Sequence, residues 1–222
     1  MSEPRLAVLD DPAAAVGTLL AEQAQREGTI VLTGGTSVER AYSLAAAQRP
    51  DWHRASLWWS DERCVPPDDE RSNFALAKRS LLDHLARPPQ VHRIEGELPA
   101  PEAAAAYDRA LEGVELDLLL LGLGPDGHIA SLFPGSAQLA ERHTRATYGP
   151  AGVEPFVERV TMTLPALLSA RRTALLVTGG EKAAALARML RGPIDPEAPA
   201  SLLREGGGAI EVYADPAAAA AL

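Results

Sequence analysis

The sequence predicts an α/β protein with a doubly wound, mostly parallel, Rossmann-like sheet and helices on both of its faces. Short apolar runs alternate with segments of helical character along nearly the whole chain, which is the pattern of β-α units. The run at 118–121 is all leucine and lacks polar alternation, as expected of a central strand covered on both faces. With 222 residues, 46% of them hydrophobic, the chain is long enough for one large core, so we expect one domain over residues 1–222.

Each expected strand is a short apolar run bounded by turn residues. In chain order, the predicted strands are Leu6–Leu9, Thr29–Leu32, Ser56–Trp59, Val91–Ile94, Leu118–Leu123, Val160–Thr163, Ala174–Thr178 and Ile210–Tyr213. The segments between them carry helix starts, such as proline in the first turn or a serine or threonine cap, and alanine-rich stretches that form helices well. The predicted helices are Pro12–Arg26, Ser37–Gln48, Ser72–Ala86, Pro101–Leu111, Leu164–Ser169, Glu181–Leu190 and a last turn near Pro216–Leu222. Residues 137–158, rich in glycine and proline, are predicted as a surface excursion, either an inert loop or a mobile cover over a site.

Composition narrows the possible partners and compartments. A formal net charge of −9 argues against nucleic-acid binding, which needs a basic surface. The N-terminus shows no basic and apolar signal segment and the longest apolar run is too short to cross a bilayer, so we expect a cytoplasmic protein that does not bind membranes. The single cysteine, Cys64, allows no internal disulfide and is expected to be a packing residue. None of the five histidines has metal-ligand spacing to another ligand, so no metal is expected.

The segment 118–135 reads LLLLGLGPDGHIASLFPG and places Asp126 and His128 just after the buried strand. Open α/β sheets carry their chemistry at this end of a strand. A histidine there can take a proton from water while a carboxylate fixes its ring, or it can simply satisfy the backbone of a tight turn. The same glycines match G-x-G-x-x-G, but Pro134 and Gly135 stop any long helix, so a nicotinamide-dinucleotide site is disfavoured and no cofactor is expected.

Two further strand ends are followed by glycine turns. The turn Thr33–Ser37 leads into a helix that Thr36 or Ser37 could cap, and its glycines and free N–H groups favour an anion such as phosphate, although a plain turn has the same pattern. The stretch 177–182 repeats the arrangement and adds Lys182. The chain contains no Walker motif, so a nucleoside triphosphate is not expected.

A charged triplet, Asp61 to Arg63, emerges at another strand end and is either a site component or a salt-bridged strand end. Because the chain is acidic overall, an anionic ligand must meet a local positive site. The candidate cations are Arg63, Arg159 and Lys182, each of which could also be a plain surface charge.

Together these stretches resemble the 6-phosphogluconolactonase family, pentose-phosphate-pathway hydrolases related to glucosamine-6-phosphate deaminases. The motifs span nearly the whole chain in order: TGGTS at 33–37, WSDERCVP at 59–66 with Ser72-Asn73, LGLGPDGHIASLFPG at 121–135, RVTMTLP at 159–165, GGEK at 179–182 and PASLL at 199–203. The resemblance implies hydrolysis of 6-phospho-D-glucono-1,5-lactone to 6-phospho-D-gluconate. That reaction requires no metal or cofactor, and we expect a monomer or a homodimer.

The resemblance also implies roles for individual residues. His128 looks like the general base, Asp126 would orient its ring, and Arg63 or backbone N–H groups after Gly124 would stabilise the oxyanion. The residues implied to bind substrate or its phosphate are Gly34, Gly35, Thr36, Ser37, Asp61, Arg159 and Lys182.

Two alternatives share part of this pattern. In the deaminases D-G-H is followed by a segment ending in N-E-P, whose glutamate assists ring opening, but Phe133 stands at the corresponding place and cannot transfer a proton. Arg63 likewise replaces the tyrosine that follows D-E in deaminases. A non-catalytic sugar-phosphate sensor would be expected to lose His128 before the phosphate turn.

Overall fold

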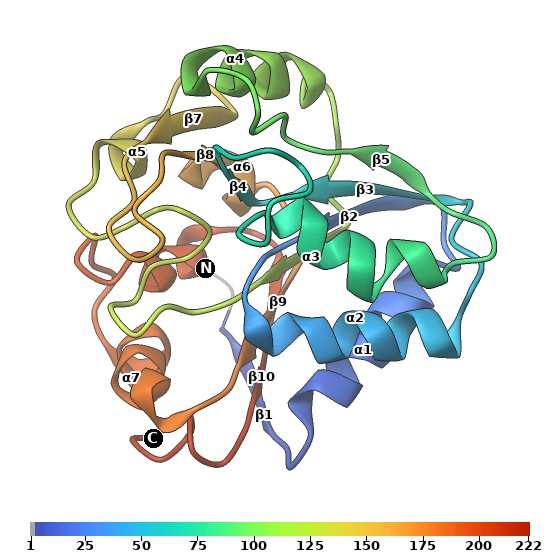
Figure 1. Cartoon of the computed structure of the whole chain (residues 1–222). Coiled ribbons are helices and arrows are strands. Elements are labelled where there is room, and N and C mark those ends of the chain that lie inside the picture. The colour runs from blue at the N-terminus through green and yellow to red at the C-terminus, as the bar shows by residue number, and fades with distance from the viewer. Residues whose placement is uncertain (1–2) are drawn as a thin grey trace.

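The computed structural model describes residues 3–222 and contains two sheets (Figure 1). The larger has seven strands in the order β1-β10-β9-β6-β2-β3-β5, and every neighbouring pair is parallel. Its strands are β1 (Arg5–Val8), β2 (Gly28–Leu32), β3 (Ala55–Trp59), β5 (Gln90–His92), β6 (Leu118–Leu121), β9 (Arg172–Val177) and β10 (Ala209–Ala214). The predicted mostly parallel sheet is therefore confirmed.

Helices cover both sides of this sheet. The α-helices are α1 (Pro12–Gln23), α2 (Thr36–Gln48), α3 (Asn73–Ser80), α4 (Ala100–Ala110), α5 (Ala137–Ala140), α6 (Leu164–Leu168) and α7 (Ala183–Arg191), and the 3-10 helices are η1 (Leu82–His84), η2 (Gly180–Lys182) and η3 (Pro199–Glu205). In Figure 1, α1, α2 and α3 lie together on one side of the sheet, and α4 lies on the other. As predicted, Ser72 caps α3, its hydroxyl accepting from the Ala75 N–H. No helix within residues 3–222 is long and apolar enough to cross a membrane.

The smaller sheet was not predicted. It is antiparallel, in the order β4-β8-β7, and consists of β4 (Asp61–Arg63), β8 (Arg159–Met162) and β7 (Ala146–Gly149). The strand expected near 160–163 is therefore present but belongs to this second sheet. The expected surface excursion at 137–158 contains α5 and β7, so part of it has regular structure.

The expected helices near the C-terminus also differ in detail. The helix expected over 181–190 splits into η2 and α7, whereas residues 216–221 form turns and no helix. The alanine run 217–221 has helix propensity but is too short to stabilise a helix by itself.

The strand order places a crevice between β2 and β6. From β2 the chain adds β3 and then β5 on one side, and then returns to place β6, β9 and β10 on the other. Such a reversal of strand order is where open α/β sheets bind ligands, beyond the carboxyl ends of the strands. All four leucines of β6 are 0% exposed, so the strand is fixed in the core on both faces. The segments that follow β2 and β6 therefore open into one space.

Candidate active site

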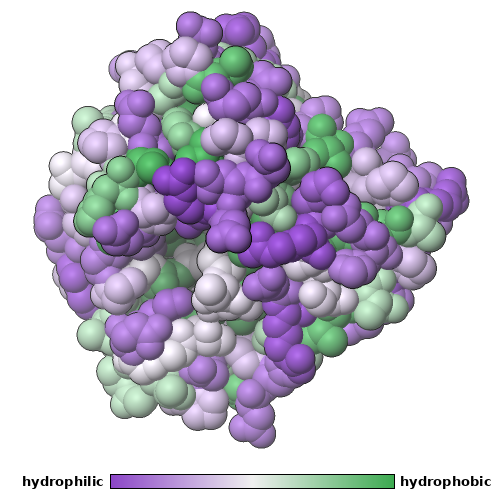
Figure 2. Space-filling model, viewed as in Figure 1, coloured by the Kyte–Doolittle hydropathy of each residue, from purple (hydrophilic) through white to green (hydrophobic). Residues whose placement is uncertain are grey.

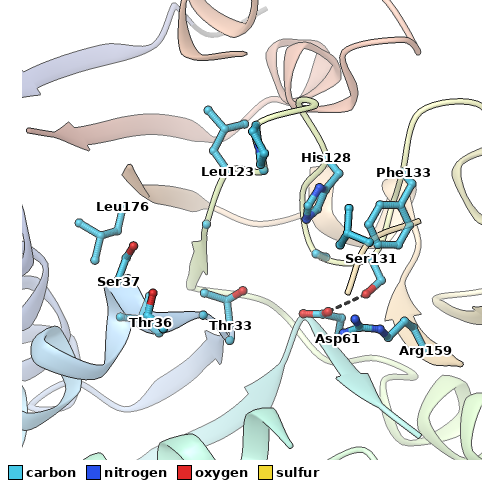
Figure 3. Close-up of a pocket in the computed structure, with 18 of the residues that line it drawn as sticks. Thr33, Thr36, Ser37, Asp61, Leu123, His128, Ser131, Phe133, Arg159 and Leu176 are labelled. Atoms are coloured by element: carbon cyan, nitrogen blue, oxygen red, sulfur yellow. Dashed lines mark hydrogen bonds between the residues drawn. The ribbon is translucent and has the colours of Figure 1, made fainter. Parts of the chain in front are cut away.

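A pocket of about 240 Å³ lies at this crevice, and Figure 2 shows the hollow with strongly hydrophilic residues on its rim. A cavity of this size suits a small metabolite. The predicted site residues that line it are Gly34, Gly35, Thr36, Ser37, Asp61, Arg63, His128, Arg159 and Lys182. Asp126 does not line the pocket but contacts His128 behind it. The structure thus brings together residues from segments far apart in sequence (Figure 3).

His128 is held by Asp126 in the loop that follows β6. The imidazole Nδ1 lies 2.6 Å from Asp126 Oδ1, and the same oxygen accepts the His128 backbone N–H at 3.1 Å. Burial raises the pKa of Asp126, but the hydrogen bonds and charge of His128 outweigh it and bring the pKa below the usual value. An ionised carboxylate can only accept, so Nδ1 carries a proton, and in the neutral form of the ring Nε2 keeps its free electron pair. The ring is therefore set up to accept a proton at Nε2.

Gly124 makes room for this pair. A Cβ at Gly124 would lie 2.0 Å from His128 Nδ1 and 2.7 Å from Asp126 Oδ1, so any side chain there would displace both groups. The Gly124 N–H in turn donates to the His128 carbonyl at 3.0 Å, which closes the loop. Of the three glycines that resemble a dinucleotide fingerprint, Gly124 thus makes room for the histidine, and no long helix follows them, since α5 has four residues.

Phe133 packs against the histidine ring. The two ring centroids lie 4.7 Å apart with the planes tilted by 48°, and Phe133 is 5% exposed. A Cβ at Gly152 would lie 3.0 Å from Phe133 Cγ, so the backbone at Gly152 lies against the phenyl ring. An apolar, proton-inert group therefore lies beside His128, held in place by the segment that the sequence predicted as a surface excursion.

The two glycines of the turn Thr33–Ser37 serve different purposes. At Gly34 a Cβ would lie 1.8 Å from Asn73 Oδ1, so glycine is required because α3 packs there. At Gly35 a Cβ would meet open space, but φ is +104°, a conformation that favours glycine. Gly35, not Thr36 or Ser37, is the N-cap of α2, and no side chain caps the helix. The expected hydroxyl cap is wrong because the glycine conformation already turns the chain into the helix.

Lys182 reaches the pocket from a second glycine turn, but that turn differs from the first. Its Gly179 N–H donates to both carboxylate oxygens of Asp215, at 3.3 and 3.0 Å. A protein carboxylate therefore occupies the N–H that an anionic ligand would use. The two turns are joined by a hydrogen bond of 2.8 Å between the hydroxyls of Ser37 and Thr178. The second turn thus contributes Lys182 and a tie to the first turn.

Arg63 and Arg159 lie directly across from each other on β4 and β8. Arg159 is 3% exposed and donates from Nη2 to the Pro155 carbonyl at 2.9 Å, and Arg63 donates from Nη1 to the Arg71 carbonyl. The Nε of each is buried without a hydrogen-bond partner. Burial, and then the positive charge of Arg63, lower the pKa of Arg159. Two cations with unused buried donors at a pocket wall are suited to hold an anionic or strongly polar ligand group.

The residues of the charged triplet Asp61–Arg63 have different surroundings. Asp61 faces the pocket, where its carboxylate accepts from the Ser131 hydroxyl at 2.7 Å (Figure 3) and from the Ser60 hydroxyl at 3.0 Å. Glu62 points away, is 2% exposed, and accepts from the start of α3, including the Asn73 N–H at 2.7 Å. Burial raises the pKa of Glu62, and these hydrogen bonds oppose the rise. Asp61 and Arg63 thus belong to the site, whereas Glu62 attaches β4 to α3.

Several pocket residues were not predicted as site residues. They are Thr33, Val38, Gly122, Leu123, Gly124, Pro125, Ala130, Ser131, Phe133, Val153, Glu154 and Leu176. Ser131 lies in the motif after His128, and Ala130 before it has a left-handed φ of +48°, which no local pattern signals. Val153 and Glu154 enter the pocket from the glycine- and proline-rich segment. Within residues 3–222, no three His, Cys, Asp or Glu side chains cluster as a metal site.

A pocket at the strand-order reversal, with cations on its walls and a carboxylate-paired histidine beside them, is the arrangement of an α/β enzyme that acts on a small anionic molecule. The chain belongs to the family described as glucosamine-6-phosphate isomerases/6-phosphogluconolactonase, whose sequence profile matches residues 7–212.

Individual relatives agree with this family. The human 6-phosphogluconolactonase is 39% identical over 201 residues, covering 85% of this chain and 78% of the human protein. A probable chloroplastic 6-phosphogluconolactonase of rice (Oryza sativa subsp. indica) is 38% identical over 181 residues, which cover 73% of this chain but only 56% of the rice protein. The solved structure of 6-phosphogluconolactonase from Trypanosoma brucei superposes with a TM-score of 0.87 at 26% identity and covers 100% of both chains.

Proposed function

We propose that the chain hydrolyses 6-phospho-D-glucono-1,5-lactone to 6-phospho-D-gluconate, as a carboxylic ester hydrolase of the oxidative pentose phosphate pathway. The observation that carries the proposal is the pairing of His128 with Asp126 beside a pocket whose walls hold Arg63, Arg159 and Lys182. A lactone hydrolase needs a base for water, and a phosphorylated substrate needs cations. The names of the human and Trypanosoma brucei relatives support the same reaction.

The proposed chemistry uses His128 twice. Its Nε2 removes a proton from a water molecule as the water oxygen attacks the lactone carbonyl carbon, which leaves a tetrahedral oxyanion. The carbonyl then re-forms as the bond to the ring oxygen breaks, and the imidazolium returns its proton to that oxygen. The product is the open-chain acid. Asp126 holds the ring through Nδ1 and stabilises the imidazolium between the two steps.

The remaining groups divide between the oxyanion and the phosphate. Arg63, or backbone N–H groups after Gly124, would stabilise the oxyanion, and Asp61 and Arg159 would contact the sugar acid part of the substrate. The turn Gly34–Ser37 and Lys182 would hold the phosphate. The phosphate lies far from the reacting bond, so its binding energy positions the lactone carbonyl beside His128.

Deaminase chemistry is the main competing function in this family. Opening an aminosugar ring and moving a proton between carbons needs a second acid or base near the histidine. The side chain packed on His128 is Phe133, whose ring has no exchangeable proton. This contact favours lactone hydrolysis over deamination.

The direct test supplies freshly prepared lactone and follows acid release against the spontaneous rate. We expect acid release far above the spontaneous rate, and a rate equal to the spontaneous one would leave the chain as a non-catalytic sugar-phosphate sensor. The reaction should proceed equally well in EDTA and without nicotinamide cofactors, because the proposed steps use only side chains and water. A strict metal requirement would contradict the histidine mechanism.

Ammonia release from glucosamine 6-phosphate distinguishes the two family chemistries. We expect none, because Phe133 cannot take the place of a carboxylate. Ammonia production at a rate comparable with lactone hydrolysis would overturn the assignment.

Three broader properties are part of the proposal. We expect a monomer or a homodimer, and sedimentation measures which it is. The buried apolar residues form one cluster, which supports one domain and predicts a single thermal unfolding transition. We expect a cytoplasmic protein, and because the rice relative is chloroplastic by name, cell fractionation is the test.

A further inference from the structure

Two buried tyrosines make the same contact with the backbone of neighbouring strands. The Tyr42 hydroxyl donates to the Thr33 carbonyl at 2.7 Å and accepts the Thr33 N–H at 3.1 Å. The Tyr107 hydroxyl donates to the Trp59 carbonyl at 2.8 Å and accepts the Trp59 N–H at 2.9 Å. Tyr42 is 0% and Tyr107 4% exposed. Each hydroxyl thus satisfies both backbone groups of one residue, as a neighbouring strand normally would.

The Tyr42 contact lies where β2 and β6 separate. The last paired residues of these strands are Val31 and Leu119. On the other side of β2, the Ser60 N–H donates to the Leu32 carbonyl at 2.8 Å, so that carbonyl faces β3. Along a strand, the N–H and C=O of one residue point to the same side, and those of the next residue point to the opposite side. The N–H and C=O of Thr33 therefore face the crevice. Tyr42 satisfies them at the point where the sheet opens to form the pocket.

Thr33 is also the first residue of the turn that we assign to the phosphate. The turn continues through Gly35 into α2, and α2 carries Tyr42 about two turns further on. The chain runs from Thr33 through the turn into α2, and the Tyr42 hydroxyl on α2 then contacts Thr33 again. Tyr42 does not line the pocket, so it contacts no ligand itself.

We propose that Tyr42 is a positioning residue for phosphate binding: its hydroxyl fixes Thr33 and thereby the direction in which the turn Gly34–Ser37 leaves β2. The inference rests on the proposed function, because it takes this turn as the phosphate site. Without the hydroxyl, two buried backbone groups lose their partner, and Thr33 rotates toward water in the crevice to recover one. That rotation moves the N–H groups that meet the phosphate.

Tyr42→Phe tests the inference because it removes the hydroxyl and keeps the ring. Calorimetric titration with 6-phosphogluconate should show about tenfold weaker binding, while kcat at saturating lactone stays within about twofold of the wild type, because His128 and Asp126 lie on a different loop. A kcat loss larger than the loss of affinity overturns the inference.

Tyr107→Phe is the matched control. It removes the same hydroxyl from an equally buried ring that contacts Trp59 and not the turn. We expect a similar fall in thermal midpoint but less than about twofold change in 6-phosphogluconate affinity. Equal losses of affinity in the two variants would mean that general destabilisation is the cause, and would overturn the inference.

The same experiments separate this inference from the proposed function. A wild-type protein that hydrolyses no lactone overturns the proposed function, and the binding comparison still decides the role of Tyr42. A wild-type protein that hydrolyses the lactone, with Tyr42→Phe binding 6-phosphogluconate normally, overturns the inference alone.

Amide hydrogen exchange in the wild-type protein decides the case in which Tyr42→Phe does not fold. A Thr33 amide held by the Tyr42 hydroxyl should exchange slowly with and without 6-phosphogluconate. Exchange of that amide at the rate of an exposed loop in the free protein overturns the inference.

Discussion

The loop after β6 and the turn after β2 lie on opposite sides of one crevice and use glycine for opposite purposes. Gly124 leaves space for side chains of the protein itself, because a Cβ would lie 2.0 Å from His128 Nδ1. Gly35 has open space around it and is needed for its φ of +104°. One side of the pocket therefore arranges side chains for chemistry, whereas the other arranges backbone for binding. Substitutions on the two sides should separate turnover from affinity.

The largest effect is expected for His128→Ala. Loss of the base should lower kcat by about 10²- to 10⁴-fold and change the affinity for 6-phosphogluconate little. Steady-state kinetics with fresh lactone and titration with 6-phosphogluconate measure the two quantities. Near-normal turnover by this variant would show that His128 only stabilises the turn and that the general base lies elsewhere.

Gly124→Ala sharpens the comparison without removing any functional group. The added methyl must displace His128 and Asp126 together, so kcat should fall by roughly 10- to 100-fold with little change in affinity. The comparison variant is Gly122→Ala in the same loop. A Cβ there meets no protein atom within 4 Å but lies at the pocket, so this variant can change affinity, while its kcat should fall much less than that of Gly124→Ala. Equal losses in the two variants would show that the loop, and not the space beside the imidazole, is sensitive.

Lys182→Ala should give the smallest effect, and it should change affinity and not turnover. Binding of 6-phosphogluconate should weaken by roughly tenfold, as for the loss of one hydrogen bond to a charged group. Turnover of unphosphorylated gluconolactone should change much less. Lys78→Ala is the control, since Lys78 pairs with Asp83 on the exposed surface and not in the pocket. If Lys182→Ala impairs both lactones equally, the lysine does not contact the phosphate.

The large sheet could be predicted because its signals are local. Buried parallel strands are short apolar runs, and all seven strands of that sheet lie at predicted positions, with ends that differ by a few residues. The position of the pocket followed from the same signal, because polar residues just after buried strands meet at one edge of the sheet. His128 and Asp126 are the clearest example.

The small sheet could not be predicted because its strands are short and partly polar. β4 is the charged triplet Asp61–Arg63, and β7 lies within a segment rich in glycine and proline. β4 also pairs with β8 across roughly a hundred residues of sequence, which no local pattern reports. The facing positions of Arg63 and Arg159 follow only from that pairing.

The two glycine turns show the same limit. Thr33–Ser37 and the turn before Lys182 look alike in sequence, yet only the second has an N–H occupied by a carboxylate. That carboxylate belongs to Asp215, which follows β10 and lies 36 residues further along the chain. The local motif thus indicated two anion-binding turns, but in the second turn the Gly179 N–H already donates to a carboxylate of the protein.

The position of β1 at the edge of the large sheet has a consequence for synthesis of the chain. Its only sheet neighbour is β10, and Arg5 pairs with Glu211, roughly 200 residues later. During synthesis β1 therefore has no sheet partner until β10 has been made. Leu6 and Val8 stay exposed even in the folded protein, at 38% and 48%, so β1 presents an unpaired apolar edge during that interval.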